Sequence, residues 1–224
     1  MKKRIFITAT NTDIGKTYTT KLLLKEFASR GIRVGVIKPI ETGVDKVAHD
    51  GEELLRTLKD VNPECQKISV KDIVPIKYRL PAAPFVSSNG EKLDFKKLER
   101  AVEKMEEFCD VLIIEGAGGL FVPVDEENMM IDLISYFKAD ALLVTHCSLG
   151  CINDTLLSKK ALQDRKIPHI VAFNCRKNDD SFSIVSEPYF LKTNQKVLKV
   201  SKDIDTICDV LYNLSSYKKN KVEQ

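Results

Sequence analysis

The stretch FITATNTDIGKT, residues 6–17, decides the fold of this chain. Its first residues continue an apolar run that begins at Arg4 and predicts a buried strand over residues 4–8. A polar loop follows, and Gly15-Lys16-Thr17 then opens an apolar-faced helix that we expect to end at Arg30 and Gly31. The predicted order is therefore a strand, a loop and a helix start.

The Gly-Lys-Thr triplet has the residues that bind a polyphosphate at a helix start. Free backbone N–H groups there carry partial positive charge and attract phosphate oxygens. Gly15 leaves room for the phosphates, Lys16 can reach the β- and γ-phosphates, and the Thr17 hydroxyl can ligate Mg²⁺. The standard Gly-x4-Gly-Lys-Ser/Thr pattern is not met, because the first glycine is missing and the loop, counted from Ala9, is one residue longer. An ordinary helix N-terminus is the alternative.

Length and composition restrict the class of protein. A chain of 224 residues with 43% hydrophobic side chains can form one large domain, which we place at residues 1–224, or two small ones. The net charge is +3, with acids and bases interspersed, and gives no argument for nucleic acid. The N-terminal apolar run is too short for a signal sequence and no later run could span a bilayer, so we expect a cytoplasmic protein without a membrane partner.

The cysteines are scattered and give no sign of a metal site. None of the six forms a Cys-x-x-Cys pair, and the three histidines do not join them at the spacing of a zinc finger. His146, Cys147 and Cys151 form a local cluster after an apolar strand, which core packing explains better than zinc. We expect the cysteines to be free thiols, as is usual in the cytoplasm.

Strands and helices alternate along the rest of the chain. Apolar runs predict strands at residues 33–37, 110–114, 141–145 and 169–173, and helical periodicity predicts helices at 50–58, 94–108, 129–137 and 154–163. Residues 60–92 are interpreted as a surface excursion, followed near the end by a strand at 197–200 and a helix at 204–214. The alternation predicts an α/β fold, a single-domain parallel sheet with helices on both faces, of the P-loop NTPase type.

Ligands of such sheets bind where the strands end, and polar residues gather there. Lys38, Glu115 and Asn174 each follow a predicted strand, and Asn153 lies at a helix start. Glu115 is interpreted as a carboxylate that positions a metal or a water, with a cap or turn residue as the alternative. For Lys38 the alternative is a surface lysine. Asp50 lies at a helix start, where aspartate is usually a cap.

Together these motifs resemble the dethiobiotin synthetases, ATP-dependent enzymes that close the ureido ring in biotin synthesis. The resemblance rests on residues 12–17, 38–43, Asp50, 115–119 and 149–153, and extends from the N-terminus to about Asn174. It implies that 7,8-diaminopelargonate forms a carbamate with CO2, that the carbamate attacks the γ-phosphate of ATP to give a carbamoyl-phosphate mixed anhydride, and that the second amine then closes the ring. It also implies a homodimer with the substrate site at the interface.

The resemblance implies a role for each matching residue. Lys16 and Lys38 would be catalytic, and Thr17, Asp50 and Glu115 would hold Mg²⁺. Nucleotide contacts would come from Thr12, Asp13, Ile14, Gly15, Lys16, Thr17, Glu115, Gly116, Ala117, Gly118, Asn174 and Cys175. Substrate contacts would come from Thr12, Thr42, Gly118, Gly150, Cys151 and Asn153.

The sequence departs from the family pattern in two places. Ala9 replaces a glycine at the start of the loop, and we expect altered rather than lost binding if its φ is negative. Residues 175–201 lack the segment that encloses the base, so we expect weak nucleotide affinity or a weak choice of ATP over GTP.

Two other classes of P-loop protein are alternatives to the synthetase. A related ATP-dependent amidotransferase would need a glutaminase domain, for which the chain is too short. A nucleotide-switched P-loop ATPase of the partition type would act through a protein partner, but residues 9–14 lack the extra lysine of that class.

Overall fold

A five-stranded parallel sheet forms the centre of the protein. The computed structural model describes residues 2–176, 179 and 181–222, the side chains of 215–222 excepted. The sheet order is β2-β5-β1-β6-β7 and every pairing within it is parallel. The strands are β1 (Lys3–Ala9), β2 (Val34–Ile37), β5 (Val111–Gly119), β6 (Asp140–His146) and β7 (His169–Asn174). The fold class predicted from the sequence, an α/β parallel sheet in one domain, is confirmed.

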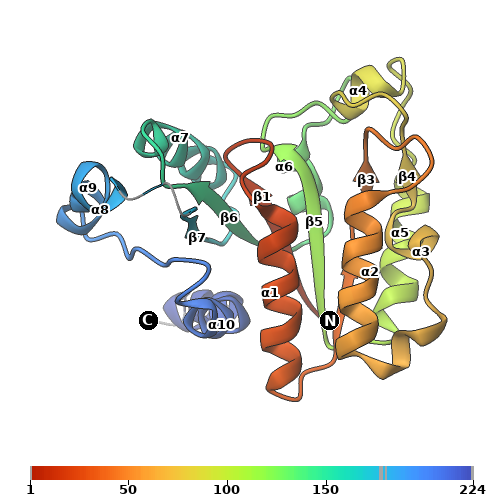
Figure 1. Cartoon of the computed structure of the whole chain (residues 1–224), viewed down its shortest axis with the longest axis horizontal. Helices are drawn as coiled ribbons and strands as arrows, with labels where there is room; N and C mark the ends of the chain where they lie inside the picture. Colours follow the sequence, from red (N-terminus) through yellow and green to blue (C-terminus); the bar gives the residue numbers. More distant parts are fainter. Residues whose placement is uncertain (1, 177–178, 180, 223–224) are drawn as a thin grey trace.

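Helices cover both faces of the sheet (Figure 1), which explains why the strands are continuous apolar runs. In the view of Figure 1, α1 and α2 lie in front of the sheet and α5 and α6 behind it. Phe6 of β1 and Phe27 of α1 are among the largest fully buried side chains of the core. The main helices are α1 (Lys16–Ser29), α2 (His49–Val61), α5 (Phe95–Glu106), α6 (Met130–Tyr136), α7 (Cys151–Asp164) and α10 (Ile204–Val222).

The predicted excursion at residues 60–92 contains short elements rather than loop alone. They are η1 (Pro63–Lys67), α3 (Val70–Ile73), β4 (Ile76–Lys77) and α4 (Pro84–Ser87). The strand β4 pairs with β3 (Ile40–Glu41) in a small second parallel sheet. Ile73 and Val74 are buried in the main core, so this segment is part of the same domain and fixes the chain just after Lys38.

Several elements differ from the sequence prediction, among them α10, which continues to Val222 rather than ending at residue 214. The strand β5 continues through the glycine-rich residues 115–119, so Glu115 lies inside a strand rather than after it. The helix α7 starts at Cys151, three residues before the predicted start at Asp154. Residues 197–200 form no strand: they are joined to Phe173 by one isolated parallel bridge at Lys199. The short helices α8 (Phe182–Val185) and α9 (Glu187–Lys192) precede that bridge.

The prediction that all cysteines are free thiols is wrong for two of them. Cys147 and Cys175 form a disulfide, and the other four cysteines are free and buried. The signal was missing from the sequence because the two residues are 28 positions apart and are brought together only by the pairing of β6 with β7. Within the described part of the chain, no helix has the length and apolarity needed to cross a membrane.

Candidate active site

The phosphate loop, residues 10–15, connects the end of β1 to the start of α1. Gly15 is the N-cap of α1 in the left-handed region, with φ 100°, and a Cβ there would lie 2.1 Å from Asn174 Nδ2. Glycine is therefore required both by the backbone conformation and by the close approach. Ala9 precedes the loop as the last residue of β1, paired with Val144 and Gly119, and its φ is not positive. A methyl group is accommodated there without backbone strain.

Lys16 lines the cavity at the phosphate loop. The side chain is buried, and its Nζ donates a hydrogen bond to the Asn11 carbonyl at 3.2 Å. Burial, and then the nearby charge of Lys38, lower the pKa of Lys16 to about 8. An ammonium with so little solvent and one weak protein partner is poised to bind an anion.

Lys38 lines the same cavity and is held between two carboxylates. Its Nζ is 2.8 Å from Glu115 Oε1 and 2.5 Å from Asp50 Oδ2, and the residue is only 4% exposed. Burial acts to lower the pKa of Lys38, but the charges of Glu115 and Asp50 outweigh it and raise the pKa above its usual value. Lys38 is therefore a fixed, charged group in the site and not a surface lysine.

Glu115 is fully buried, and both of its oxygens are used. Oε1 accepts hydrogen bonds from the Thr17 hydroxyl at 2.8 Å and from Lys38, and Oε2 accepts one from the Thr20 hydroxyl at 2.7 Å. The alternative of a turn or cap residue is wrong, since Glu115 lies in β5. Sequence reasoning missed Thr20, although its position three residues after Thr17 places both hydroxyls on one face of α1.

The Asp50 carboxylate can face the site because it is not needed to cap α2. The N-cap of α2 is Ala48, and the Glu41 carboxylate accepts the backbone N–H groups of Asp50 at 3.1 Å and of Gly51 at 3.0 Å. Burial raises the pKa of Glu41. Burial also opposes ionisation of Asp50, but the charge of Lys38 prevails and lowers the pKa of Asp50. The capping role expected for aspartate thus belongs to Glu41, which the sequence analysis did not assign to the site.

The donor set around Lys38 suits a magnesium ion. Thr17, Asp50 and Glu115 supply one hydroxyl and two carboxylates, which are oxygen ligands of the kind that Mg²⁺ prefers. The described residues contain no group of three or more His, Cys, Asp and Glu side chains able to hold a metal by themselves. Mg²⁺ in phosphate-binding enzymes usually takes one or two carboxylates and completes its shell with substrate phosphates and water, so the residues present fit that pattern.

A cavity of about 610 Å³ opens over the phosphate loop and collects most of the predicted residues. Glu115 is buried and does not line it. The start of α7, with Gly150, Cys151 and Asn153, does not line it either. Tyr18, Glu41 and Arg176 line it without having been predicted. The predicted residues in its lining are Thr12, Asp13, Gly15, Lys16, Thr17, Lys38, Thr42, Asp50, Ala117 and Gly118.

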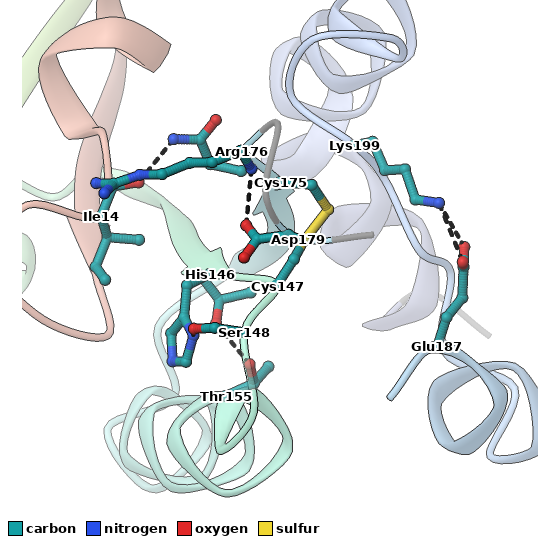
Figure 2. The surroundings of a disulfide bond; sticks show 12 residues. Ile14, His146, Cys147, Ser148, Thr155, Cys175, Arg176, Asp179, Glu187 and Lys199 are labelled. Carbon is teal, nitrogen blue, oxygen red and sulfur yellow. Dashed lines mark hydrogen bonds and ion pairs between the residues drawn. A yellow bond between two sulfur atoms is a disulfide. The ribbon is translucent and has the colours of Figure 1, made fainter. Parts of the chain in front are cut away.

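The last residue of β7 and the segment that follows it contact the phosphate loop. The Asn174 amide donates a hydrogen bond to the Ile14 carbonyl at 2.8 Å, and the Arg176 guanidinium donates one to the Asp13 carbonyl. Between them, Cys175 is joined to Cys147 (Figure 2). In the structure Asn174 and Arg176 therefore hold the loop.

Fold and site define the class of protein: an α/β P-loop nucleotide-binding protein, and the family model described as an AAA domain matches residues 3–220. The ATP-dependent dethiobiotin synthetase BioD of Sulfurovum sp. is 43% identical over 83% of this chain and 89% of its own. The enzyme of the same name from Wolinella succinogenes is 34% identical over 93% of this chain and 98% of its own. The chain belongs to the dethiobiotin synthetase family.

Among solved structures, the fold is shared with more distant proteins. A plasmid partition protein from Borrelia burgdorferi superposes with a TM-score of 0.56 over 97% of this chain and all of its own length, at 13% identity. At that level of identity the likeness concerns the fold alone.

Proposed function

We propose that this chain is an ATP- and Mg²⁺-dependent ligase that forms dethiobiotin from 7,8-diaminopelargonate and CO2, by way of a carbamate and a carbamoyl-phosphate mixed anhydride. The observation that carries the proposal is the placement of Lys16 and Lys38 at one cavity, with Thr17, Asp50 and Glu115 beside them. The family supports the same reaction, because relatives at 43% and 34% identity carry the name of this synthetase.

The two lysines serve an anionic reaction. A carbamate and the γ-phosphate repel each other, and fixed cations that face both of them stabilise the charge of the transition state. Lys16 binds the β- and γ-phosphates together with the N–H groups at the start of α1. Lys38 is held in place by Glu115 and Asp50, so it meets the reacting oxygens without first being ordered.

Magnesium belongs to this proposal as the partner of ATP. Thr17, Asp50 and Glu115 would hold it, and when bound it would neutralise charge on the phosphates. The Thr20 hydroxyl positions Glu115 by donating a hydrogen bond to its carboxylate. Glu41 positions Asp50 by accepting its backbone N–H. The residues around the ion are therefore themselves held by neighbours.

The diamine would lie between Thr12, Thr42 and Gly118, which line the cavity; a Cβ on Gly118 would lie 3.6 Å from the Thr12 hydroxyl oxygen. Its carboxylate end needs a separate anion site, for which the start of α7 is suited. Gly150 caps that helix with φ 97° and has no side chain to bond the first N–H groups, and it is exposed. Because Gly150, Cys151 and Asn153 do not line this cavity, we propose that they serve the cavity of a second subunit in a homodimer.

The base is proposed to be held loosely. The Asn174 amide, which the family would use for adenine, already donates to Ile14, and Cys175 is bonded to Cys147. Titration with Mg²⁺ complexes of ATP, GTP and CTP should give affinities within about tenfold of each other, the effect of roughly one hydrogen bond. Tight binding that is selective for adenine would overturn this part of the proposal. A cytoplasmic location is proposed with the function, because ATP is supplied there.

Phosphate release is the test of the whole proposal. The reaction would contain ATP, Mg²⁺, bicarbonate and 7,8-diaminopelargonate, and each would be omitted in turn while dethiobiotin is measured by mass spectrometry. We expect release that requires both the diamine and bicarbonate, with one dethiobiotin per phosphate. Phosphate release that does not depend on the diamine would show that the protein is not a dethiobiotin synthetase.

That last outcome would favour the partition-type reading, in which nucleotide turnover serves a protein partner. The distant partition proteins support only a common fold. Residues 9–14 also contain no lysine that could reach across to a second subunit's nucleotide. Stimulation of ATP hydrolysis by a protein partner in place of the diamine is the result that would establish it.

A further inference from the structure

We propose that Cys147 and Cys175 form a reversible redox-modification site that controls how firmly the phosphate loop is held, and hence the affinity for Mg·ATP. Cys147 directly follows β6 and Cys175 directly follows β7. His146 pairs with Asn174 in the register of these strands, so the two cysteines leave the sheet side by side. Their Cα atoms are 4.9 Å apart, a separation that a disulfide spans without movement of the backbone.

The bridge secures the segment that touches the phosphate loop. Cys175 stands between Asn174 and Arg176, whose side chains donate to the carbonyls of Ile14 and Asp13. The strand β7 ends at Asn174, so Arg176 has already left the sheet. Its backbone N–H donates to the nearby Asp179 carboxylate, which lies in the same segment. Figure 2 shows Arg176 and Asp179 beside the bridge, with Ile14 on the far side of Arg176. The disulfide is thus a second covalent link between this segment and the sheet, besides the peptide bond that joins Cys175 to Asn174.

On its other side the bridge meets the start of α7. The His146 ring contacts the Ser148 hydroxyl at 2.6 Å and the Asp154 carboxylate at 3.0 Å. These contacts fix the residues on either side of Cys147 to the first turn of the helix. The bridge therefore links the segment at the phosphate loop to a part of the chain that is itself well anchored, and breaking it releases the segment of Cys175 rather than that of Cys147.

The bridge is accessible from one side. Cys147 is buried, whereas Cys175 is partly exposed, so we expect a small thiol to attack the disulfide at Cys175. Cys151 lies in the same apolar cluster, but burial raises the pKa of its thiol. Because the thiolate is the form that attacks a disulfide, this shift disfavours exchange of Cys151 into the bridge. The pair is therefore opened and closed by external thiols and disulfides.

The chemistry balances as thiol–disulfide exchange. On oxidation the two cysteine thiols give two protons and two electrons to a low-molecular-weight disulfide, which leaves as two thiols, and one S–S bond forms in the protein. Reduction by a dithiol is the reverse. In the cytoplasmic location proposed above, disulfides are usually transient and are catalytic or redox-sensing, which favours a reversible switch over a permanent structural bond.

The first experiment counts thiols. The protein is equilibrated with oxidised glutathione or with dithiothreitol, unfolded in acid, alkylated and weighed by mass spectrometry. We expect four alkylated cysteines after oxidation and six after reduction, with a linked peptide pair that contains Cys147 and Cys175. Six alkylated cysteines in both states, or a different linked pair, would overturn the proposal.

The second experiment measures the dissociation constant of Mg·ATP by calorimetry in both redox states. We expect it to rise about fivefold on reduction, the effect of losing one hydrogen bond of ordinary net strength. Cys147→Ser and Cys175→Ser should each give one value in both buffers. The matched control is Cys65→Ser, a buried free cysteine in η1, which should keep the redox response. An unchanged wild-type constant, or a response that survives Cys147→Ser, would refute the control of affinity.

The inference rests on the nucleotide-binding part of the proposed function only. Mg·ATP binding is read without the diamine, so it does not depend on ring closure. If the synthetase reaction fails while the affinity still responds to reduction, the proposed function is wrong and the redox site stands. If dethiobiotin forms while the affinity for Mg·ATP is the same in the oxidised and reduced protein, the proposed redox control is wrong.

Discussion

The affinity of the protein for Mg·ATP should fall above pH 8 because of Lys16. Burial, and then the charge of Lys38, bring the pKa of Lys16 down to about 8 in the nucleotide-free protein. A bound triphosphate is an opposite charge, so it raises that pKa, and binding requires the protonated ammonium. The nucleotide therefore binds at full strength below pH 8 and must recruit a proton above it.

The size of the effect follows from the pKa. About nine-tenths of Lys16 is protonated at pH 7 and about one-tenth at pH 9, so the association constant should fall about tenfold between them. The pKa of Lys38 is raised by Glu115 and Asp50, so Lys38 stays charged across this range. The break in the profile therefore reports Lys16.

Calorimetric titration of Mg·ATP from pH 6.5 to 9.5 gives the assay, with Lys16→Arg as the matched control. Arginine keeps its charge over the whole range, so the variant should bind more weakly at pH 7 but lose no further affinity at pH 9. A wild-type constant that is level up to pH 9.5, or a decline of equal size in Lys16→Arg, would refute the assignment of the break to Lys16.

Three substitutions test the contacts of the site. Gly15→Ala places a Cβ 2.1 Å from Asn174 Nδ2, in a left-handed conformation that alone costs about 1–2 kcal/mol. Calorimetry should therefore detect little Mg·ATP binding by this variant. Near-normal binding would contradict the conformation described for the phosphate loop. Thr20→Val leaves one oxygen of Glu115 without its hydrogen-bond donor and should lower the free energy of unfolding, measured in urea, by about 1–3 kcal/mol. Thr20→Ser keeps the hydroxyl and should be as stable as the wild type. Equal stability of the wild type and both variants would show that Thr20 does not support Glu115. Lys38→Ala should reduce turnover far more than the affinity for Mg·ATP, and an intact rate of dethiobiotin formation would mean that Lys38 has no part in the chemistry.

The sheet and the phosphate loop were predictable because their causes are local. Continuous apolar runs specify strands that are covered on both faces, and Gly15-Lys16-Thr17 follows the first of them after a short polar loop. The rule that ligands bind where parallel strands end then brings Lys38 and the loop together without any knowledge of contacts. Glu115 was assigned to the same edge, although it lies inside β5.

The extension of β5 escaped prediction because its glycines have a packing role. Four small residues in a row are typical of a loop, yet here they continue the strand. A Cβ on Gly116 would lie 2.7 Å from the Phe6 ring, and one on Gly119 would lie 3.3 Å from the Thr10 carbonyl. The absence of side chains lets β5 pass close to β1 and the loop, which no periodicity within the segment reveals.

Contacts between distant residues account for what else was missed. Glu41 caps α2 from β3, and Arg176 reaches the loop from beyond β7, so neither has a neighbour in sequence that indicates its role. The disulfide is of the same kind, because it depends on the register of β6 against β7. Fold class followed from local patterns, whereas the groups that position the site followed only from tertiary structure.

The charges of the site explain why metal and nucleotide should enter together. Lys16 and Lys38 face the carboxylates of Asp50 and Glu115, so these four side chains are balanced before any ligand binds. Mg²⁺ alone would have to compete with the ammonium of Lys38 for both carboxylates, and nothing would offset the added charge. Mg·ATP carries the ion together with an excess of negative charge, which Lys16 and the start of α1 bind. The buried lysine that holds the two carboxylates in place is therefore also what makes the site select the complex over the free ion.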